Sequence, residues 1–408
     1  MRPLARERGG APRPLRIGFV RMAPHPIPNR LLVEALASAL PHAQIFVLDL
    51  EPLARRDRGA VVANAPFVAA EHGRNLVRGR VRPWQAFFTT TFMFRWMSHR
   101  ARHWALANGF DWTLQIQSLF DARAPGIPHF VYTDHTHLAN LDYPDFDPRT
   151  LRSPRWIALE RALYHGARTV FTRSSNVSAS LADRYGCDPA RTVCVGAGSN
   201  AGVPGAPIAR SPLGRDVLFV GVDWERKGGP DLAAAFARVR QRHSSATLTI
   251  VGCEPPLVPL GARVLGRRPL DEIHRHYRHA DVFCLPTRRE PFGVAFVEAL
   301  HHALPIVATR IGAVPDLVEH GKNGFLVEVG DIAGLARHLD QLLCDPALRL
   351  RMGAAGERRA REHYTWRAVA NRISDAVRGA VRPIDPGAVR TPDRRRSGAW
   401  PSNEHARC

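Results

Sequence analysis

The sequence predicts an α/β protein with two doubly wound domains, and three observations lead to that prediction. The chain has 408 residues, which is enough for two domains at roughly 150 residues each. Short apolar runs alternate with helix-compatible segments along most of the chain, as in parallel sheets covered by helices. Between two such sets lies a stretch dense in glycine and proline, residues 196–215, which is typical of a domain boundary.

The first half of the chain is predicted to form one sheet with its helices. Its first strand leads through a proline-rich loop into a helix that Asn29 would cap. Further helices are expected at 156–164 and after Ser174 or Ser175. The expected strands are 15–20, 45–50, 112–116, 130–132, 169–172 and 192–195.

Residues 83–104 are the most aromatic part of the chain and carry interleaved arginines. One interpretation is an interfacial helix that docks on anionic lipid. The other is a helix packed on the sheet, whose arginine side chains extend outward to water. The preceding residues 55–82 are rich in arginine and show no clear pattern.

The second half repeats the alternation of strands and helices. Strands are expected at 216–220, 246–251, 262–265, 281–285 and 305–309, with helices at 231–239, after Asp331 and at 365–381. The chain is therefore divided into a disordered basic tail (1–13), an N-terminal domain (14–200), a linker or hinge (201–215), a C-terminal domain (216–364), a C-terminal helix that crosses back to the first domain (365–381) and a second disordered basic tail (382–408).

The stretch 281–324 contains two strand–loop–helix units in succession. Ligands of doubly wound folds bind beyond the carboxyl ends of the strands, so both loops are expected to line one crevice. Pro291 and Gly293 place Glu290 in the first loop and Glu298 on the helix beyond it. A carboxylate can accept two hydrogen bonds from a vicinal diol, as in ribose binding. The spacing alone also fits two surface carboxylates around a turn.

An anion site is predicted beside these carboxylates. The backbone N–H groups of Phe292, Gly293 and Val294 begin a helix, which suits a diphosphate. A second basic loop, with Arg226 and Lys227 between glycines, follows the strand 216–220. There a guanidinium fork and an ammonium point charge would neutralise phosphates, although a solvated basic turn has the same pattern.

A polar cluster follows the strand 130–132 of the first domain and contains Asp134, His135 and His137. This position is again one where ligand loops lie. An Asp-His-x-His run alone lacks the further ligands of a metal site, so we expect no metal there.

Residues 216–375 resemble the nucleotide-sugar domain of family 4 glycosyltransferases of the GT-B fold. Residues 15–200 match that family more weakly, through SLF, YTDHTH, RTVFTRSS and VGAGSN. The pieces that carry the stronger resemblance are LFVGVDWERKGG, TLTIVG, YRHADVFCLPTRREPFGVAFVEAL, LPIVATRIGAVPDLVEHGKNGFLV and the terminal YTW.

The resemblance implies two Rossmann-like domains that face each other across a cleft and close about the linker. It also implies roles on the donor side. Glu290 would contact hydroxyls of the donor sugar, Glu298 would hold the ribose, and Lys227 would bind the diphosphate. The backbone of Phe292, Gly293 and Val294 would hold sugar and phosphate.

Two further assignments follow from the resemblance. The family commonly has an arginine directly after the glycine that corresponds to Gly221, a donor-site residue, but this chain has Val222 there. Arg226 would take over that role. A histidine of the first domain is expected near the donor sugar, and His135 and His137 both fit.

The implied reaction moves a sugar from a nucleoside-diphosphate sugar to a hydroxyl acceptor with retention and without a metal or other cofactor. The acceptor is left open among a glycan, a lipid-linked molecule and a small molecule. One alternative is a sugar-nucleotide epimerase of the same fold. Another is a basic protein that binds a polyanion or a membrane. Because the pairing of carboxylates with a lysine has no role in such a binder, we expect no nucleic-acid partner.

Composition bears on partners and location. The net charge is +20, which suits polyanionic partners such as nucleotide diphosphates or anionic lipid headgroups, although an arginine-rich composition alone accounts for it. No apolar run approaches the roughly 20 residues that span a bilayer. The N-terminus lacks the apolar core of a signal peptide. We therefore expect a cytoplasmic protein with peripheral contact at the inner face of the membrane.

Overall fold

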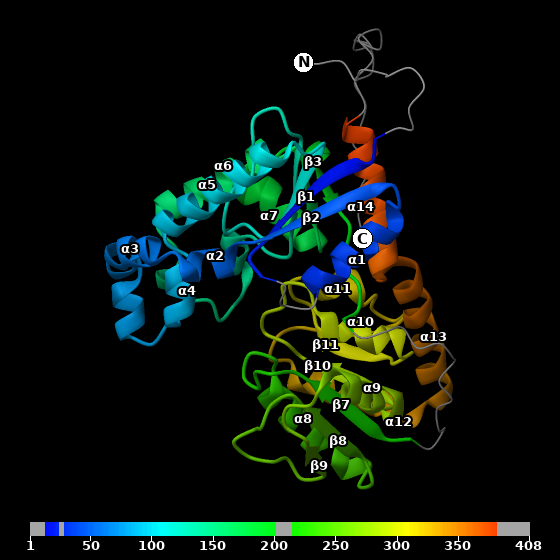
Figure 1. Cartoon of the computed structure of the whole chain (residues 1–408). Helices are drawn as coiled ribbons and strands as arrows, with labels where there is room; N and C mark the ends of the chain where they lie inside the picture. Colours follow the sequence, from blue (N-terminus) through cyan, green and yellow to red (C-terminus); the bar gives the residue numbers. More distant parts are fainter. Residues whose placement is uncertain (1–12, 24–27, 201–213, 382–408) are drawn as a thin grey trace, which may run out of the picture.

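The computed structural model describes residues 13–23, 28–200 and 214–381. These residues form two α/β lobes, which lie one above the other in Figure 1, each built on a six-stranded sheet. The predicted fold class of two Rossmann-like domains is thereby confirmed. The predicted tails and linker lie outside the described residues, apart from residue 13 of the first tail and the last two linker residues.

The sheet of the first lobe is parallel, with strand order β2-β1-β3-β4-β5-β6. Ile17 of β1 pairs with Ile45 on one side and with Trp112 on the other. Strands β3 and β4 are buried along their whole length. The strands are β1 (Leu15–Arg21), β2 (Ala43–Asp49), β3 (Trp112–Ile116), β4 (His129–Thr133), β5 (Thr169–Thr172) and β6 (Thr192–Cys194).

The helices of this lobe correct two predictions. Asn29 is not a cap: it lies inside α1, and its side-chain amide donates to the Ala23 carbonyl oxygen at 3.2 Å. The aromatic segment forms two helices, because Thr90 caps a new one. The helices are α1 (Pro28–Ala39), α2 (Leu50–Arg56), α3 (Arg58–Val77), α4 (Pro83–Phe88), α5 (Thr91–Asn108), α6 (Pro154–Gly166) and α7 (Ser175–Tyr185).

Helix α5 buries one face, with Met93, Phe94 and Met97 at most 2% exposed. This packing favours the second interpretation of the aromatic segment, a helix docked within the lobe.

The sheet of the second lobe is also parallel, with strand order β12-β11-β10-β7-β8-β9. Its strands are β7 (Asp216–Val220), β8 (Thr247–Val251), β9 (Ala262–Val264), β10 (Val282–Leu285), β11 (Ile306–Thr309) and β12 (Gly324–Val327). Its helices are α8 (Gly229–Arg242), α9 (Leu270–His279), α10 (Val294–His301), α11 (Val314–Leu317), α12 (Ile332–Cys344) and α13 (Pro346–His363). The sheet order reverses between β7 and β10, and a doubly wound sheet binds its ligand at that switch point.

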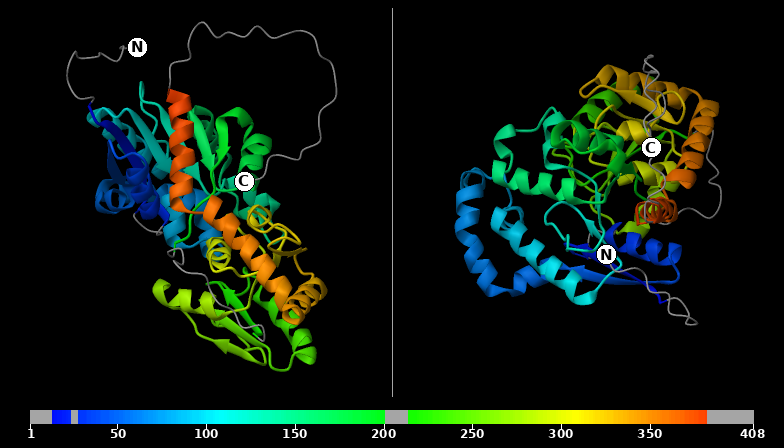
Figure 2. Two further views of the ribbon diagram at one scale, coloured as in Figure 1. Left: turned by 90° about the vertical axis from the view of Figure 1, so that its right-hand side faces the viewer. Right: turned by 90° about the horizontal axis from the view of Figure 1, so that it is seen from above.

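The last helix, α14 (Trp366–Val381), packs on the first lobe. Its residues Val369 and Ile373 share a buried cluster with Leu32 and Leu36 of α1. Figures 1 and 2 show the course of the chain, with α13 along the second lobe and α14 beside the first. The indole N–H of Trp366 donates to the Ser199 carbonyl oxygen at 2.8 Å. Within the described residues, the chain therefore returns from the second lobe to the first through α13 and α14.

Candidate active site

Two loops of the second lobe meet at the switch point, one after β7 and one after β10. The Arg288 N–H donates to the Arg226 carbonyl oxygen at 2.9 Å, which fixes one loop to the other. Lys227 and Glu290 form an ion pair between them, and their side chains are 12% and 6% exposed. The structure thus brings together the predicted lysine and the first predicted carboxylate in a nearly buried contact.

Gly221 makes room for this lysine. A Cβ atom at Gly221 would lie 3.0 Å from Cγ of Lys227. That approach is tighter than an ordinary contact, so a larger residue would displace the lysine stem. The glycine at the end of β7 therefore contributes space beside the ion pair.

Arg226 points in a different direction from Lys227. Its guanidinium bonds Asp223 and donates to the Arg289 carbonyl oxygen at 3.2 Å. It also lines a cavity of about 510 Å³. The lining also includes Asp145 of the first lobe and Arg288 of the second. The cavity therefore lies between the lobes, and its lining combines three arginines with three acidic residues.

The start of α10 is shaped for a close approach. Gly293 caps the helix with φ at +98°, a left-handed conformation that favours glycine. Within the described residues, the N–H groups of Phe292, Gly293 and Val294 donate no hydrogen bond. The loop after β11 closes over this turn, because the Ala313 N–H donates to the Glu290 carbonyl oxygen at 3.1 Å. Three N–H groups thus remain for a ligand beside Glu290.

Glu298 lies on α10, as predicted, while Glu290 lies in the loop. Its carboxylate accepts a hydrogen bond from the Tyr277 hydroxyl at 3.0 Å. Only 5% of Glu298 is exposed. This burial raises the pKa of its carboxyl group from 4.5 to about 7. The two predicted carboxylates therefore differ: Glu290 is held by a cation, whereas Glu298 is held by a neutral hydroxyl.

The first lobe contributes a second, smaller cavity of about 190 Å³, which lies at the ends of β3 and β4. His135 lines it, and both ring nitrogens of His135 are buried without a hydrogen-bond partner in the described structure. Burial lowers the pKa of this imidazole, which keeps it neutral. Its ring stacks on Tyr143 with centroids 5.9 Å apart.

His137 lies in the same cavity wall but is hydrogen-bonded through one ring nitrogen. Its Nε2 accepts a hydrogen bond from the Arg152 N–H at 2.9 Å, and its ring packs edge-on against Trp156. Burial lowers the pKa of His137 to about 2. The bond from Arg152 places the ring proton on Nδ1. The two candidate histidines therefore have different surroundings, one unpartnered and one bonded.

Two polar residues of this cavity were not predicted from the sequence. Gln117 has φ at +73°, and its side-chain oxygen is buried without a partner. Such backbone strain in a non-glycine residue clusters at functional sites. Arg152 lines the cavity as well, with its guanidinium carbon 3.8 Å from the Trp156 ring centroid. Gln117 could have been predicted, because it directly follows a predicted strand. No local sequence pattern indicates Arg152.

The lobes touch beside both cavities. Arg288 forms an ion pair with Asp145 at 3.4 Å. The Ser175 hydroxyl donates to the Asp316 carboxylate at 2.6 Å. Tyr143 joins the buried core of the second lobe, and the negative charge of Glu290 contributes to a raised pKa of its hydroxyl, after burial. Tyr143 therefore lies between His135 and Glu290.

Among the helices that the structure describes, none combines the length and the apolar character needed to cross a membrane.

Comparisons with known proteins divide the chain at the boundary between the two lobes. The family model "Glycosyltransferase Family 4" matches residues 29–200, and "Glycosyl transferases group 1" matches residues 214–345. A D-inositol 3-phosphate glycosyltransferase of Corynebacterium efficiens is 30% identical over 297 residues, which cover 66% of this chain and 69% of the relative. The enzyme of the same name from Frankia alni is 30% identical over 336 residues, 74% of this chain and 80% of the relative.

A solved structure agrees at the level of the fold. Sucrose-phosphate synthase from Thermosynechococcus elongatus superposes with a TM-score of 0.63 over 90% of this chain and 98% of that one, at 19% identity.

Proposed function

Because this chain belongs to glycosyltransferase family 4, we propose that it moves a sugar from a nucleoside-diphosphate sugar to a hydroxyl acceptor with retention of configuration. The observation that carries this proposal is the nearly buried Lys227–Glu290 pair beside unpartnered backbone N–H groups. A donor has both a diphosphate and a sugar, and the pair offers one group for each.

The donor is held by the second lobe. Its diphosphate displaces Glu290 from Lys227 and takes hydrogen bonds from the N–H groups of Phe292 and Gly293. Glu290 then accepts hydrogen bonds from the hydroxyl groups of the sugar. Glu298, deeper along α10, accepts from the ribose.

Transfer proceeds without a metal ion. The bond between the anomeric carbon and the phosphate oxygen breaks, and the acceptor oxygen bonds to the same face of that carbon. The acceptor proton passes to the leaving phosphate oxygen. Lys227, Arg226 and the α10 N-terminus stabilise the negative charge on that diphosphate, which is the largest contribution in such sites. Neutral His135 accepts or donates a hydrogen bond at the donor sugar.

The acceptor occupies the cavity of the first lobe. Polar groups without partners line it, including Gln117 and His135, and these suit a ligand rich in hydroxyl groups. The guanidinium of Arg152 adds a positive charge to the same wall. Two curated relatives are inositol phosphate glycosyltransferases by name, and a hydroxyl-rich acceptor of that class has the chemistry that this lining supports.

A membrane contact would use α3 and α4 rather than α5. Val62 is 73% exposed, Val77 90% and Trp84 55%. Apolar side chains on a surface flanked by arginine suit the boundary of an anionic membrane. The flanking arginines are Arg74, Arg78, Arg80 and Arg82. A cytoplasmic enzyme would present this surface to the inner leaflet.

The proposal is tested by turnover. The protein is incubated with UDP, GDP and ADP sugars, each with a soluble polyol or sugar-phosphate acceptor or with a lipid-linked acceptor in anionic vesicles. We expect one donor to give a glycoside that keeps the anomeric configuration of the donor, with chelator present. An isomerised nucleotide sugar in reactions without acceptor would instead identify an epimerase. No product from any donor would contradict the proposal.

A further inference from the structure

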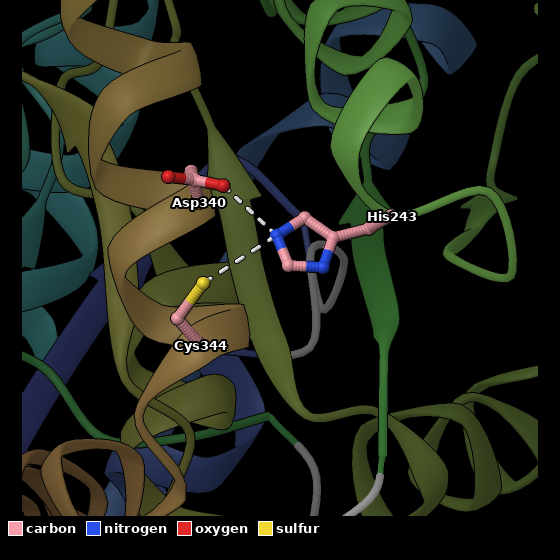
Figure 3. Close-up of side chains that lie close together, drawn as sticks. All are labelled: His243, Asp340 and Cys344. Carbon is pink, nitrogen blue, oxygen red and sulfur yellow. Dashed lines mark hydrogen bonds and ion pairs between the residues drawn. The ribbon is translucent and has the colours of Figure 1, made fainter.

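A second cluster of reactive side chains lies at the C-terminal end of α8, beside α12. His243 follows α8 and is 6% exposed. Asp340 and Cys344 stand four residues apart on α12, so they share one helix face. Figure 3 shows both side chains directed toward the imidazole of His243. The cluster therefore joins two helices that are about a hundred residues apart in the chain.

The three side chains converge on one point. Nε2 of His243 lies 2.8 Å from Oδ1 of Asp340 and 3.7 Å from Sγ of Cys344. All three ligand atoms lie within 4.8 Å of one another. A catalytic triad would divide its acid and its nucleophile between the two ring nitrogens. Here the carboxylate and the thiol approach the same nitrogen, which is the arrangement around a shared ion.

The surroundings suit a metal ligand set. The other oxygen of Asp340 accepts a hydrogen bond from Arg242 at 2.7 Å, an outer contact that orients the ligating oxygen. Two backbone hydrogen bonds hold His243 in place: its N–H donates to Val239, and its carbonyl oxygen accepts from Ala246, each at 2.9 Å. Cys344 is an exposed, free thiol. An ion could thus enter from the side of Cys344.

We propose that His243, Asp340 and Cys344 bind a single Zn²⁺ ion, which clamps α8 to α12. Imidazole, carboxylate and thiolate are the ligands that zinc prefers, and a water molecule would complete a tetrahedron. Binding releases the thiol proton of Cys344 to solvent, since a thiolate is the ligating species. Helix α8 begins directly after the loop of Arg226 and Lys227. The ion therefore stabilises the helix that supports this loop and takes no part in transfer.

The test uses the full-length protein, stripped with chelator and then titrated with Zn²⁺ alone. We expect one Zn²⁺ per chain by elemental analysis after gel filtration, and a rise in the thermal midpoint, because zinc binds the folded state. Cys344→Ser and Asp340→Asn should each weaken binding at least tenfold. Cys253→Ser, a cysteine of the same lobe outside the cluster, is the matched control and should bind zinc like the wild type.

Cobalt gives a second readout that does not depend on stability. Co²⁺ bound by the wild type should show thiolate-to-cobalt charge-transfer absorption, and Cys344→Ser should lose it while the Cys253→Ser control keeps it. Sugar transfer by Cys344→Ser should stay within twofold of the wild type. A wild type that retains no zinc, or a cobalt spectrum without the thiolate band, would overturn the proposal and leave the cluster as a hydrogen-bonded link between helices.

Discussion

The two lobes differ in how the buried polar side chains of the candidate site are paired. On the side of the second lobe, Lys227 pairs with Glu290, and Glu298 bonds a tyrosine hydroxyl. On the side of the first lobe, His135 and the side-chain oxygen of Gln117 have no partner among the described residues. An unsatisfied buried group costs about 1–3 kcal/mol. The buried side chains of the second lobe are thus paired with each other before a ligand binds, whereas those of the first lobe are left for a ligand.

Breaking the ion pair should have the largest effect. Lys227→Met and Glu290→Gln each remove one charge and keep the side-chain shape. We expect each to lower kcat by about a hundredfold to a thousandfold, the range for loss of one group that stabilises a developing anion. Each single variant should also lower the free energy of unfolding by about 3 kcal/mol, since its former partner is left buried and unpaired. Turnover and urea denaturation measure the two effects.

The double variant Lys227→Met/Glu290→Gln separates a catalytic pair from a structural one. Its stability should recover most of the loss of the single variants, because neither charge is left alone. Its turnover should stay as low as that of the worse single variant. Recovery of both stability and turnover would mean that the pair only holds the loops together.

Two histidines of the first lobe also differ: His135 has no hydrogen-bond partner, whereas His137 is bonded to the Arg152 N–H. His135→Phe removes an imidazole that makes no hydrogen bond, so stability should stay equal or rise slightly. If His135 contacts the donor sugar, kcat should fall about tenfold to a hundredfold, the value of one hydrogen bond made in the transition state. His137→Phe should lower stability and leave kcat nearly unchanged, because it leaves the Arg152 N–H without its acceptor. Loss of stability in His135→Phe with unchanged kcat would contradict this assignment.

Most of the fold was predictable because most strands of the two sheets are short apolar runs, although β12 was not predicted. Helix α13 was not predicted, although it is long. It packs through small residues: a Cβ atom at Gly353 would lie 2.1 Å from the Ala303 carbonyl oxygen, and one at Gly356 would lie 2.7 Å from Leu300. Such close packing leaves no stripe of large apolar residues to recognise. Helix α3 was missed for a similar reason, since it buries few residues and contains Pro66.

The Lys227–Glu290 pair was predictable from local motifs, since each residue lies in a loop directly after an apolar strand. The lining of the first-lobe cavity was not. Arg152 reaches its cavity from a segment without strand or helix character, through its backbone N–H bond to His137 and its contact with the Trp156 ring. The zinc cluster likewise depends on two helices from distant parts of the chain. Contacts of that kind are set by packing and leave no local pattern.

The smallest effect on turnover is expected for Glu298→Gln, which keeps the hydrogen bond to Tyr277 but removes a titrating group. The raised pKa of about 7 means that the folded protein holds a proton that the unfolded chain releases near pH 4.5. Stability should therefore fall as pH rises from about 4.5 through 7, by about 3 kcal/mol in total, and this slope should vanish in Glu298→Gln.

If the ionised carboxylate accepts from the donor ribose, donor binding at pH 6 should release up to one proton. Calorimetry in buffers of different ionisation enthalpy measures that proton. Equal proton release by the wild type and by Glu298→Gln would show that the donor does not reach this residue.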